Sequence, residues 1–141
     1  MIYLDTSAFL KLYIRENGSE RVQSIVVAQR QPLPVADFLH VEFLNALRLK
    51  VFWGELDSAT VEHLIALFDD RVYRGQYVHV PADRVRLLKD FRSLSVHTQS
   101  IGCRSLDILH VASALQLEAQ TFVTFDERQR ELASRAGLAV S

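Results

Sequence analysis

The sequence predicts an α/β fold in which helices cover both faces of a mostly parallel sheet. Short apolar segments of strand length alternate with longer segments whose apolar residues recur every three or four positions. Parallel strands need long crossovers, so this alternation favours a sheet that is buried on both faces. Acidic residues directly follow two of the predicted strands, at the edge where binding sites form in such sheets.

The first half of the chain is predicted to contain two strands and four helices. Asn17 and Gly18 form a stop-and-turn pair between the first two helices, and Gly54 ends the third. Asp37 is predicted to cap the third helix, and Asp57 or Ser58 the fourth. The predicted segments are strands at 2–4 and 32–36, helices at 7–15, 19–30 and 37–52, and a helix that follows residue 57.

The second half continues the alternation. Pro81 is predicted to begin a helix, Gly102 to break the chain, and Ser105 to cap an apolar helix. Asp126 is predicted to cap the last helix, which Gly137 ends. The predicted segments are strands at 77–80, 121–125 and 138–140, and helices at 81–98, 105–117 and 126–135.

Helical spacing also predicts which side chains lie on one apolar face. The predicted faces are Phe38, Val41, Leu44 and Leu49 in the third helix; Val61, Leu64, Ile65 and Phe68 in the fourth; and Val85, Leu88, Phe91 and Leu94 in the helix at 81–98.

Length and composition indicate one domain, residues 1–141, with the surface of an ordinary globular protein. The chain is 49% hydrophobic and 23% charged, with a formal net charge of -1, so its overall charge does not steer it toward nucleic acid. A single cysteine, Cys103, excludes an internal disulfide and fits a reducing cytoplasm. The N-terminus does not resemble a signal peptide, and no apolar run of about 18 residues exists, so we expect no membrane association.

Four acidic residues stand at positions where a fold alone does not need them. Asp5 and Asp126 follow strands, Asp107 lies in the first turn of an apolar helix, and Glu42 interrupts the apolar stripe of its helix. Each has a structural alternative. Asp5 and Asp126 are candidate N-caps, and Asp126 has Gln129 three residues on, as in a capping box. Asp107 suits the helix dipole, and Glu42 is compatible with a partly exposed helix face.

Taken together, the four acids suggest a metal site. Clustered carboxylates raise one another's pKa, so an empty cluster destabilises the fold. Mg²⁺ or Mn²⁺ relieves that repulsion, because both ions prefer oxygen ligands and retain waters. Such a site is suited to positioning a water for in-line attack on phosphorus.

At these residues the sequence resembles the PIN-domain family, and within it the VapC-type toxins of prokaryotic toxin–antitoxin pairs. The resemblance covers nearly the whole chain. It is carried by four motifs in order, which are Leu-Asp-Thr-Ser-Ala around Asp5, Val-Glu-Phe-Leu-Asn-Ala-Leu around Glu42, Arg-Ser-Leu-Asp-Ile-Leu-His-Val-Ala-Ser-Ala around Asp107, and Thr-Phe-Asp-Glu-Arg-Gln around Asp126. Each motif alone is weak, but four in order at this spacing are specific.

The resemblance implies a fold, an activity and partners. The implied fold is a three-layer α/β/α sandwich with a central, mostly parallel sheet of four or five strands. The implied activity is an Mg²⁺-dependent endoribonuclease, with a cognate antitoxin in its groove and a homodimer as its usual state. The catalytic and metal-binding residues would be Asp5, Glu42, Asp107 and Asp126. The residues that would orient these acids or bind RNA are Thr6, Ser7, Asn45, Arg104 and Thr124.

Several alternatives stay open at the level of sequence. A PIN fold that binds RNA or protein without cutting is the main one, and nuclease action on DNA flaps is another. Haloacid-dehalogenase phosphatases also place an acid after strand one, but they need a second one where Ser7 stands. The five histidines lack the spacing of a zinc site. Whether Glu127 joins the site is undecided, and His110 is interpreted either as a partner of Asp107 or as a satisfied core histidine.

One set of basic residues has two interpretations. Arg84, Arg86, Lys89, Arg92 and Arg104 are interpreted as flanking the groove and holding the phosphate backbone. For the first three, a solvated helix face is the alternative interpretation.

Overall fold

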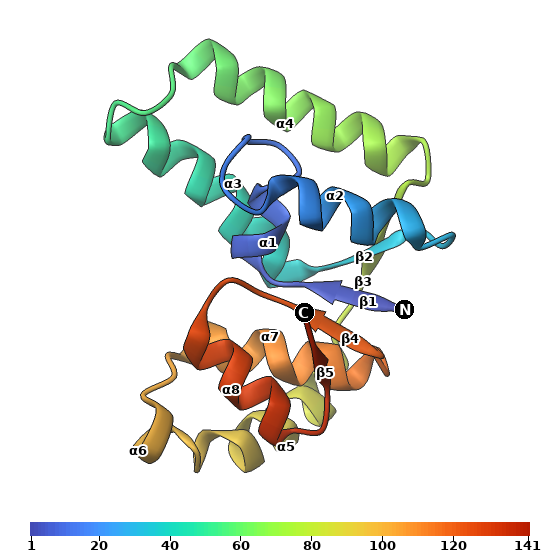
Figure 1. Ribbon diagram of the computed structural model, residues 1–141, viewed down its shortest axis with the longest axis vertical. Coiled ribbons are helices and arrows are strands. Elements are labelled where there is room, and N and C mark those ends of the chain that lie inside the picture. The colour runs from blue at the N-terminus through green and yellow to red at the C-terminus, as the bar shows by residue number, and fades with distance from the viewer.

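A layer of short parallel strands lies between two groups of helices in the structure, a computed structural model that describes residues 1–141 (Figure 1). The strands are β1 (Ile2–Leu4), β2 (Leu33–Ala36), β3 (Tyr77–Val80), β4 (Thr121–Val123) and β5 (Ala139–Val140). The helices are α1 (Thr6–Leu10), α2 (Ser19–Ala28), α3 (Asp37–Phe52), α4 (Ser58–Tyr73), α5 (Arg84–Ser95), α6 (Thr98–Ile101), α7 (Ser105–Gln116) and α8 (Glu127–Arg135).

The predicted parallel sheet is confirmed, but its backbone hydrogen bonds divide it into two ladders. One ladder has the order β1-β4-β5 and the other pairs β2 with β3, and every pair is parallel. Strand β1 lies beside β2 without joining it. The amide of Ile2 donates instead to Oε1 of Gln29 at 2.6 Å, so a side chain takes a hydrogen bond that a neighbouring strand would otherwise make.

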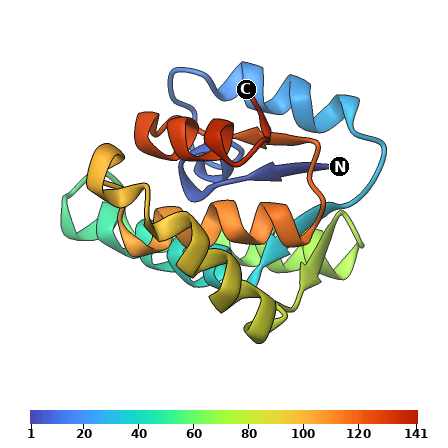
Figure 2. The same cartoon turned by 90° about the horizontal axis from the view of Figure 1, so that it is seen from below.

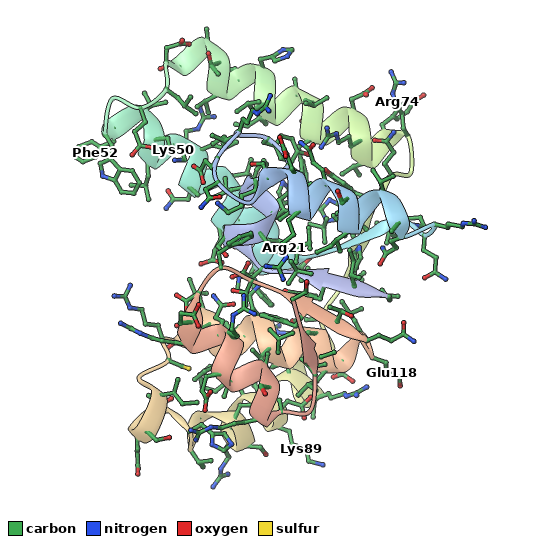
Figure 3. All side chains as sticks on the ribbon, in the orientation of Figure 1. Arg21, Lys50, Phe52, Arg74, Lys89 and Glu118 are labelled. Atoms are coloured by element: carbon green, nitrogen blue, oxygen red, sulfur yellow. The ribbon has the colours of Figure 1, made fainter.

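Helices α1–α4 lie on one side of the strands and α5–α8 on the other, which gives the three-layer α/β/α arrangement (Figure 1). Helix α5 packs along α7, as Figure 2 also shows. Helices α3 and α4 form a hairpin that projects from the body of the molecule. At its turn Phe52 points away from the fold (Figure 3), with 83% of its surface exposed. No helix is long and apolar enough to cross a membrane.

One hydrophobic core joins the strands to the helices on both sides. Tyr3 of β1 stacks on Phe122 of β4, with ring centroids 5.6 Å apart. On the α1–α4 side, Phe9 packs edge-on against Phe43 at 5.1 Å, and Phe43 lies 5.4 Å from Phe68. Aromatic pairs at these separations stabilise a core beyond the effect of buried area alone. The core thereby fixes the strand ends from which the acidic side chains emerge.

Several element boundaries differ from the prediction. The helix expected at 7–15 ends at Leu10, and the chain continues to Ile14 in tighter turns, such as the bond from Tyr13 N to Leu10 O. The helix expected at 81–98 begins at Arg84, because Asp83 accepts hydrogen bonds from the next amides and caps it. It ends at Ser95, and residues 98–101 form the separate helix α6.

Two predicted caps are wrong, and two are confirmed. Ala36 is the N-cap of α3, so Asp37 is its first residue and makes no capping bond. Arg104 is the N-cap of α7, and Ser105 lies inside that helix. The cap of α4 is Asp57, and Asp126 caps α8 as predicted.

Two predicted apolar faces are only partly correct. Helix α3 packs Phe38 and Leu44 against the core as predicted, but Val41 and Leu49 are 60% and 37% exposed. Its buried residues are Leu39, Phe43 and Leu47. Helix α5 buries Leu94 and packs Phe91 against the core as predicted, but it leaves Val85 and Leu88 exposed. In both helices several apolar stripes were compatible with the spacing, and tertiary packing selects among them. The predicted face of α4 is confirmed, with Val61 and Phe68 buried and Leu64 and Ile65 packed against the core.

Candidate active site

Asp5 lies at the carboxyl end of β1 and is completely buried. Its Oδ1 accepts from the amide of Ala8 at 2.9 Å, which caps the short helix α1. The hydroxyl of Ser7 donates to this carboxylate at 2.8 and 2.9 Å from the two oxygens. Oδ2 also accepts from the hydroxyl of Thr124 at 2.7 Å. A buried carboxylate needs such donors, and here they come from α1 and from the residue that directly follows β4.

The same hydroxyls also hold the segment that leads into α8. Oγ1 of Thr124 accepts from the amide of Asp126 at 3.0 Å, and Oγ of Ser7 accepts from the amide of Phe125 at 3.0 Å. The parallel register of Leu4 with Val123 brings these two strand ends together. Asp5 therefore fixes the backbone that carries Asp126, and in Figure 1 the loop from β4 to α8 passes next to α1.

Asp107 and Asp126 line a common surface cavity of about 230 Å³. Gln129 connects them, because its side-chain Nε2 donates to Oδ1 of Asp107 at 3.2 Å and its backbone amide donates to Oδ1 of Asp126 at 3.0 Å. The second oxygen of Asp107 accepts from the amide of Arg104 at 2.7 Å. The first turns of α7 and α8 thus present two carboxylates to one cavity.

The remaining lining residues are Arg104, Glu127 and Arg128. Both arginines are exposed at the start of their helices, and Nη1 of Arg128 donates to the carbonyl of Gly102 at 3.3 Å. The side chain of Glu127 is 86% exposed and lies 3.8 Å from Arg130. The cavity therefore combines acidic oxygens with two guanidinium groups, which are suited to binding phosphate.

Glu42 is held by a separate group of hydrogen bonds. Its Oε2 accepts from the hydroxyl of Thr6 at 2.6 Å and lies 2.6 Å from Nε2 of His110. His110 is buried, and its Nδ1 lies 2.9 Å from the hydroxyl of Tyr3. His110 thus bonds to Glu42 and not to Asp107, and Thr6 bonds to Glu42 while Ser7 bonds to Asp5.

Burial and hydrogen bonding shift the two inner acids in opposite directions. Burial raises the pKa of Asp5, and the nearby His110 and the donors Thr124, Ala8 and Ser7 offset only part of that rise. Burial also raises the pKa of Glu42, but hydrogen bonds from His110 and Thr6 outweigh it and hold the pKa below its usual value. The surroundings of Glu42 thus favour its ionised form, whereas burial disfavours the ionised form of Asp5.

The structure does not gather all four acids into one protein cage. No three His, Cys, Asp or Glu side chains lie close enough to share a metal ion. Asp107 and Asp126 share the cavity, while Asp5 and Glu42 are engaged by their own donors. Oε1 of the neighbouring Gln129 is buried and has no hydrogen-bond partner. The carboxylates of Asp107 and Asp126 fit an ion such as Mg²⁺, which takes one or two carboxylates and keeps its waters.

The other residues expected near the site are more dispersed. Asn45 is exposed on α3 and makes no hydrogen bond to the acids. Arg86 faces the other end of α7, where it donates to the carbonyl of Leu115 at 3.5 Å. Lys89 projects from the outer side of α5 (Figure 3). Arg84 and Arg92 also belong to α5, and none of these four basic residues lines the acidic cavity.

Three residues of the site were not predicted from sequence. Gln129 was expected only in a capping box and Tyr3 only in a strand, and no role was predicted for Arg128, which lines the cavity. The available signal for Tyr3 was a hydroxyl in an otherwise apolar strand, since a buried hydroxyl needs a partner.

A larger cavity lies away from the acids. Its volume is about 570 Å³, and it opens at the amino ends of β2 and β3, beside Leu33 and Tyr77. Two arginines and several glutamines line it, but no acid does, so it offers no carboxylate for a metal ion.

Comparisons with known proteins identify the family and the fold. The PIN domain family model matches residues 2–135. Ribonuclease VapC46 of Mycobacterium tuberculosis is 30% identical over 141 residues, which span 99% of this chain and 95% of that protein. The sarcin-ricin loop cleaving toxin VapC20 of M. tuberculosis has a TM-score of 0.72 at 14% identity, with 99% of this chain and 97% of that chain covered. VapBC2 from Rickettsia felis, bound to a DNA fragment from its promoter, has a TM-score of 0.68 at 13% identity, with 100% and 98% covered.

The structural neighbours establish the fold, and the family match extends over both acid-bearing halves of the chain. All four motif acids lie within the matched residues 2–135. The chain therefore belongs to the PIN domain family and is a relative of the VapC-type toxin ribonucleases.

Proposed function

We propose that this protein is a metal-dependent endoribonuclease that hydrolyses RNA phosphodiester bonds as the toxin of a VapBC-type toxin–antitoxin pair. The observation that carries the proposal is the cavity in which Asp107 and Asp126 face Arg104 and Arg128. This cavity pairs oxygen ligands for a cation with guanidinium groups for a phosphate. The relationship to ribonuclease VapC46 supports RNA as the substrate.

Asp107 and Asp126 would bind Mg²⁺ or Mn²⁺ directly, and Asp5 and Glu42, each held by its own hydrogen bonds, are the other two acids of the proposed site. The ion supplies positive charge for the phosphate oxygens and lowers the pKa of a water. Arg104 and Arg128 bind the phosphate of the RNA backbone at the rim of the cavity. Asp5 keeps the backbone of Asp126 in place through Thr124.

The first prediction is that Asp107→Asn and Asp126→Asn each abolish metal-dependent RNA cleavage without unfolding the protein. Outer partners of a metal site typically contribute roughly 10- to 100-fold, so the loss of a direct ligand exceeds that range. Cleavage of labelled RNA is measured at millimolar Mg²⁺ or Mn²⁺, and folding is measured by circular dichroism.

Asp57→Asn is the matched control, because Asp57 caps α4 as Asp126 caps α8 but lies away from the cavity. Asparagine caps a helix as well as aspartate does, so both variants keep their helix. Equal activity of Asp126→Asn and Asp57→Asn would refute the assignment of Asp126. RNA binding without cleavage by the wild type would favour the alternative, a non-catalytic binding module.

The proposed partners are an antitoxin protein and a second copy of the chain. The toxin–antitoxin complexes among the structural neighbours support the first. Co-expression with the product of an adjacent reading frame, followed by purification and an RNA cleavage assay, tests whether that product binds and inhibits. Light scattering of the purified protein measures whether it forms a homodimer.

A further inference from the structure

A chain of hydrogen bonds joins four side chains from three separate segments of the fold. The hydroxyl of Tyr3 lies 2.9 Å from Nδ1 of His110, and Nε2 of that ring lies 2.6 Å from Oε2 of Glu42. The hydroxyl of Thr6 donates to the same carboxylate oxygen at 2.6 Å. Tyr3 and His110 are 0% and 1% exposed, so water does not substitute for these bonds.

The two hydrogen-bond partners of His110 agree on one tautomer of its ring. Nε2 lies 2.6 Å from Oε2 of Glu42, and a carboxylate oxygen only accepts, so Nε2 carries a hydrogen. The one hydrogen-bond partner of the Tyr3 hydroxyl is Nδ1 of His110. In a neutral ring Nδ1 then accepts, so the phenol donates to it, and the Nε2–H tautomer satisfies both bonds.

This arrangement leaves the two oxygens of Glu42 in different roles. Oε2 receives hydrogens from both His110 and Thr6, whereas Oε1 has no partner within the protein. The side chain of Glu42 is 25% exposed, so part of it remains in contact with solvent. Thr6 directly follows Asp5, so the bond from Thr6 holds Glu42 near the carboxyl end of β1.

We propose that Tyr3 and His110 are positioning residues for Glu42. Tyr3 fixes the Nε2–H tautomer of His110, and His110 together with Thr6 fixes the carboxylate so that Oε1 faces the site. This inference rests on the proposed nuclease function, in which Glu42 is one of four acids.

A purely structural role for the same residues makes a different prediction. His110 packs edge-on against Phe38 at 5.1 Å, and Tyr3 stacks on Phe122 at 5.6 Å, so both fill the core. If packing alone mattered, the effect of a substitution would follow the volume removed. If positioning matters, the effect of a substitution depends on which hydrogen bonds to Glu42 or His110 it removes. Tyr3→Phe removes only a hydroxyl, His110→Leu keeps apolar bulk, and His110→Gln keeps one donor and one acceptor.

The kinetic test measures kcat and KM for RNA cleavage and the rise in melting temperature on adding Mn²⁺. We expect Tyr3→Phe and His110→Leu to lower kcat by roughly 10- to 100-fold with little change in KM, as outer partners of a metal site do. We expect His110→Gln to recover part of that loss, and the Mn²⁺-induced rise to follow the same order.

Tyr77→Phe is the matched control. Tyr77 is 6% exposed, and its hydroxyl lies 2.7 Å from Arg71 and 3.0 Å from Tyr13, away from the acids. It therefore measures what the loss of a buried, hydrogen-bonded phenol does to the fold alone. We expect it to leave kcat unchanged.

The structural test reads the ring nitrogens of His110 by long-range ¹H–¹⁵N correlation in metal-free protein. We expect a single Nε2–H tautomer in the wild type and a shifted Nδ1 resonance in Tyr3→Phe. An Nδ1–H tautomer in the wild type, or an unchanged spectrum in Tyr3→Phe, would overturn the proposal.

The two tests separate this proposal from the nuclease assignment. If the wild type cleaves RNA and Glu42→Gln does not, but Tyr3→Phe and His110→Leu cleave normally, positioning is refuted and the nuclease stands. If the wild type cleaves no RNA with either metal, the nuclease assignment fails, and the nitrogen spectrum still decides whether Tyr3 sets the tautomer.

Discussion

At the scale of single residues, Gly18 supports the segment that carries Asp126. Its φ of +89° is in the left-handed region, and an added Cβ would lie 2.5 Å from Cε1 of Phe125. Phe125 lies between Thr124 and Asp126, and the amino group of Lys11 lies 4.5 Å from the centre of its ring. The close approach of Gly18 therefore fixes the ring beside the proposed site.

We predict that Gly18→Ala destabilises the protein more than Gly54→Ala does. Gly54 also has a positive φ, of +72°, but no atom lies within 4 Å of its added Cβ. Gly54→Ala should therefore cost only the conformational penalty of about 1–2 kcal/mol, whereas Gly18→Ala adds the contact with Phe125. Urea unfolding measures both variants.

The double variant Gly18→Ala/Phe125→Ala identifies the cause of the difference. If the ring contact causes the extra loss, removing the ring should restore part of the stability, since neighbouring residues are energetically coupled. Equal losses in Gly18→Ala and Gly54→Ala would show that Phe125 moves aside at no cost.

Single residues also show how much of the site could be predicted from the sequence. Asp5, Asp107 and Asp126 were found because acids after strands and in apolar helices are unusual. Their partners were harder to assign, since Thr6 and Ser7 are adjacent and chemically similar. In the structure Ser7 donates to Asp5 and Thr6 donates to Glu42. Only the three-dimensional path of α1 decides which hydroxyl meets which acid.

At the scale of elements, the buried face of α3 is where sequence reasoning was wrong. Leu47 is 0% exposed, and Leu49, which the spacing placed inside, is 37% exposed. Helix α3 is apolar on several sides, so no single stripe stood out. The choice depends on α1 and α4, which pack against it.

We predict that Leu47→Ala lowers the free energy of unfolding by about 2–5 kcal/mol, as buried leucine truncations do. Leu49→Ala should cost less than about 1 kcal/mol, because much of that side chain remains in water. Chemical denaturation measures both. A larger loss of unfolding free energy for Leu49→Ala than for Leu47→Ala would mean that Leu49, and not Leu47, lies in the core.

Glu16 links the end of α1 to α3 through ion pairs with two lysines. Located between α1 and α2, it accepts from Nζ of Lys11 at 3.1 Å and from Nζ of Lys50, near the end of α3, at 3.3 Å. Lys50 is labelled in Figure 3. Burial raises the pKa of Glu16, but the hydrogen bonds from the two lysines outweigh it and leave the pKa below its usual value.

We predict that Glu16→Gln destabilises the protein at pH 7 but not in strong acid. A lowered folded-state pKa contributes stability above the unfolded pKa of about 4.3, and that stability is lost as pH falls through the folded pKa. The side chain of Glu16 is 39% exposed, so after solvent screening we expect no more than about 1 kcal/mol.

Melting temperatures at pH 7 and at low pH test this prediction. Glu20→Gln is the control, because Glu20 and its partner Arg15 are 85% and 88% exposed and should contribute little at any pH. A pH-independent loss in Glu16→Gln would contradict an electrostatic role.

At the scale of the whole molecule, alternation of strands and helices was sufficient to predict the parallel sheet and its two helical layers. The local pattern did not predict that the sheet divides between β1 and β2. At that boundary the side chain of Gln29, which lies 27 positions from Ile2, accepts from the amide of Ile2, and no local sequence pattern marks this contact. The order of the four acids along the chain was likewise visible, but their separation into a cavity pair and two individually bonded acids depends on side-chain geometry.

The last prediction concerns the products of the whole enzyme. If a water attacks the phosphorus in line, a new bond forms from the water oxygen to phosphorus and the bond to the 3′ oxygen breaks. The 2′-hydroxyl takes no part, so the fragments carry a 5′-phosphate and a 3′-hydroxyl. Attack by the 2′-hydroxyl would instead leave a 2′,3′-cyclic phosphate, and it is typical of ribonucleases that use a pair of histidines.

Here the cavity is lined by Asp107, Asp126 and Glu127 with two arginines, and it contains no histidine. Ligation at the 3′ end and digestion by a 5′-phosphate-dependent exonuclease identify the ends. Cyclic phosphate ends formed in the presence of a chelator would refute both the hydrolytic route and the proposed metal dependence, because cleavage would then need neither a water nucleophile nor a metal ion.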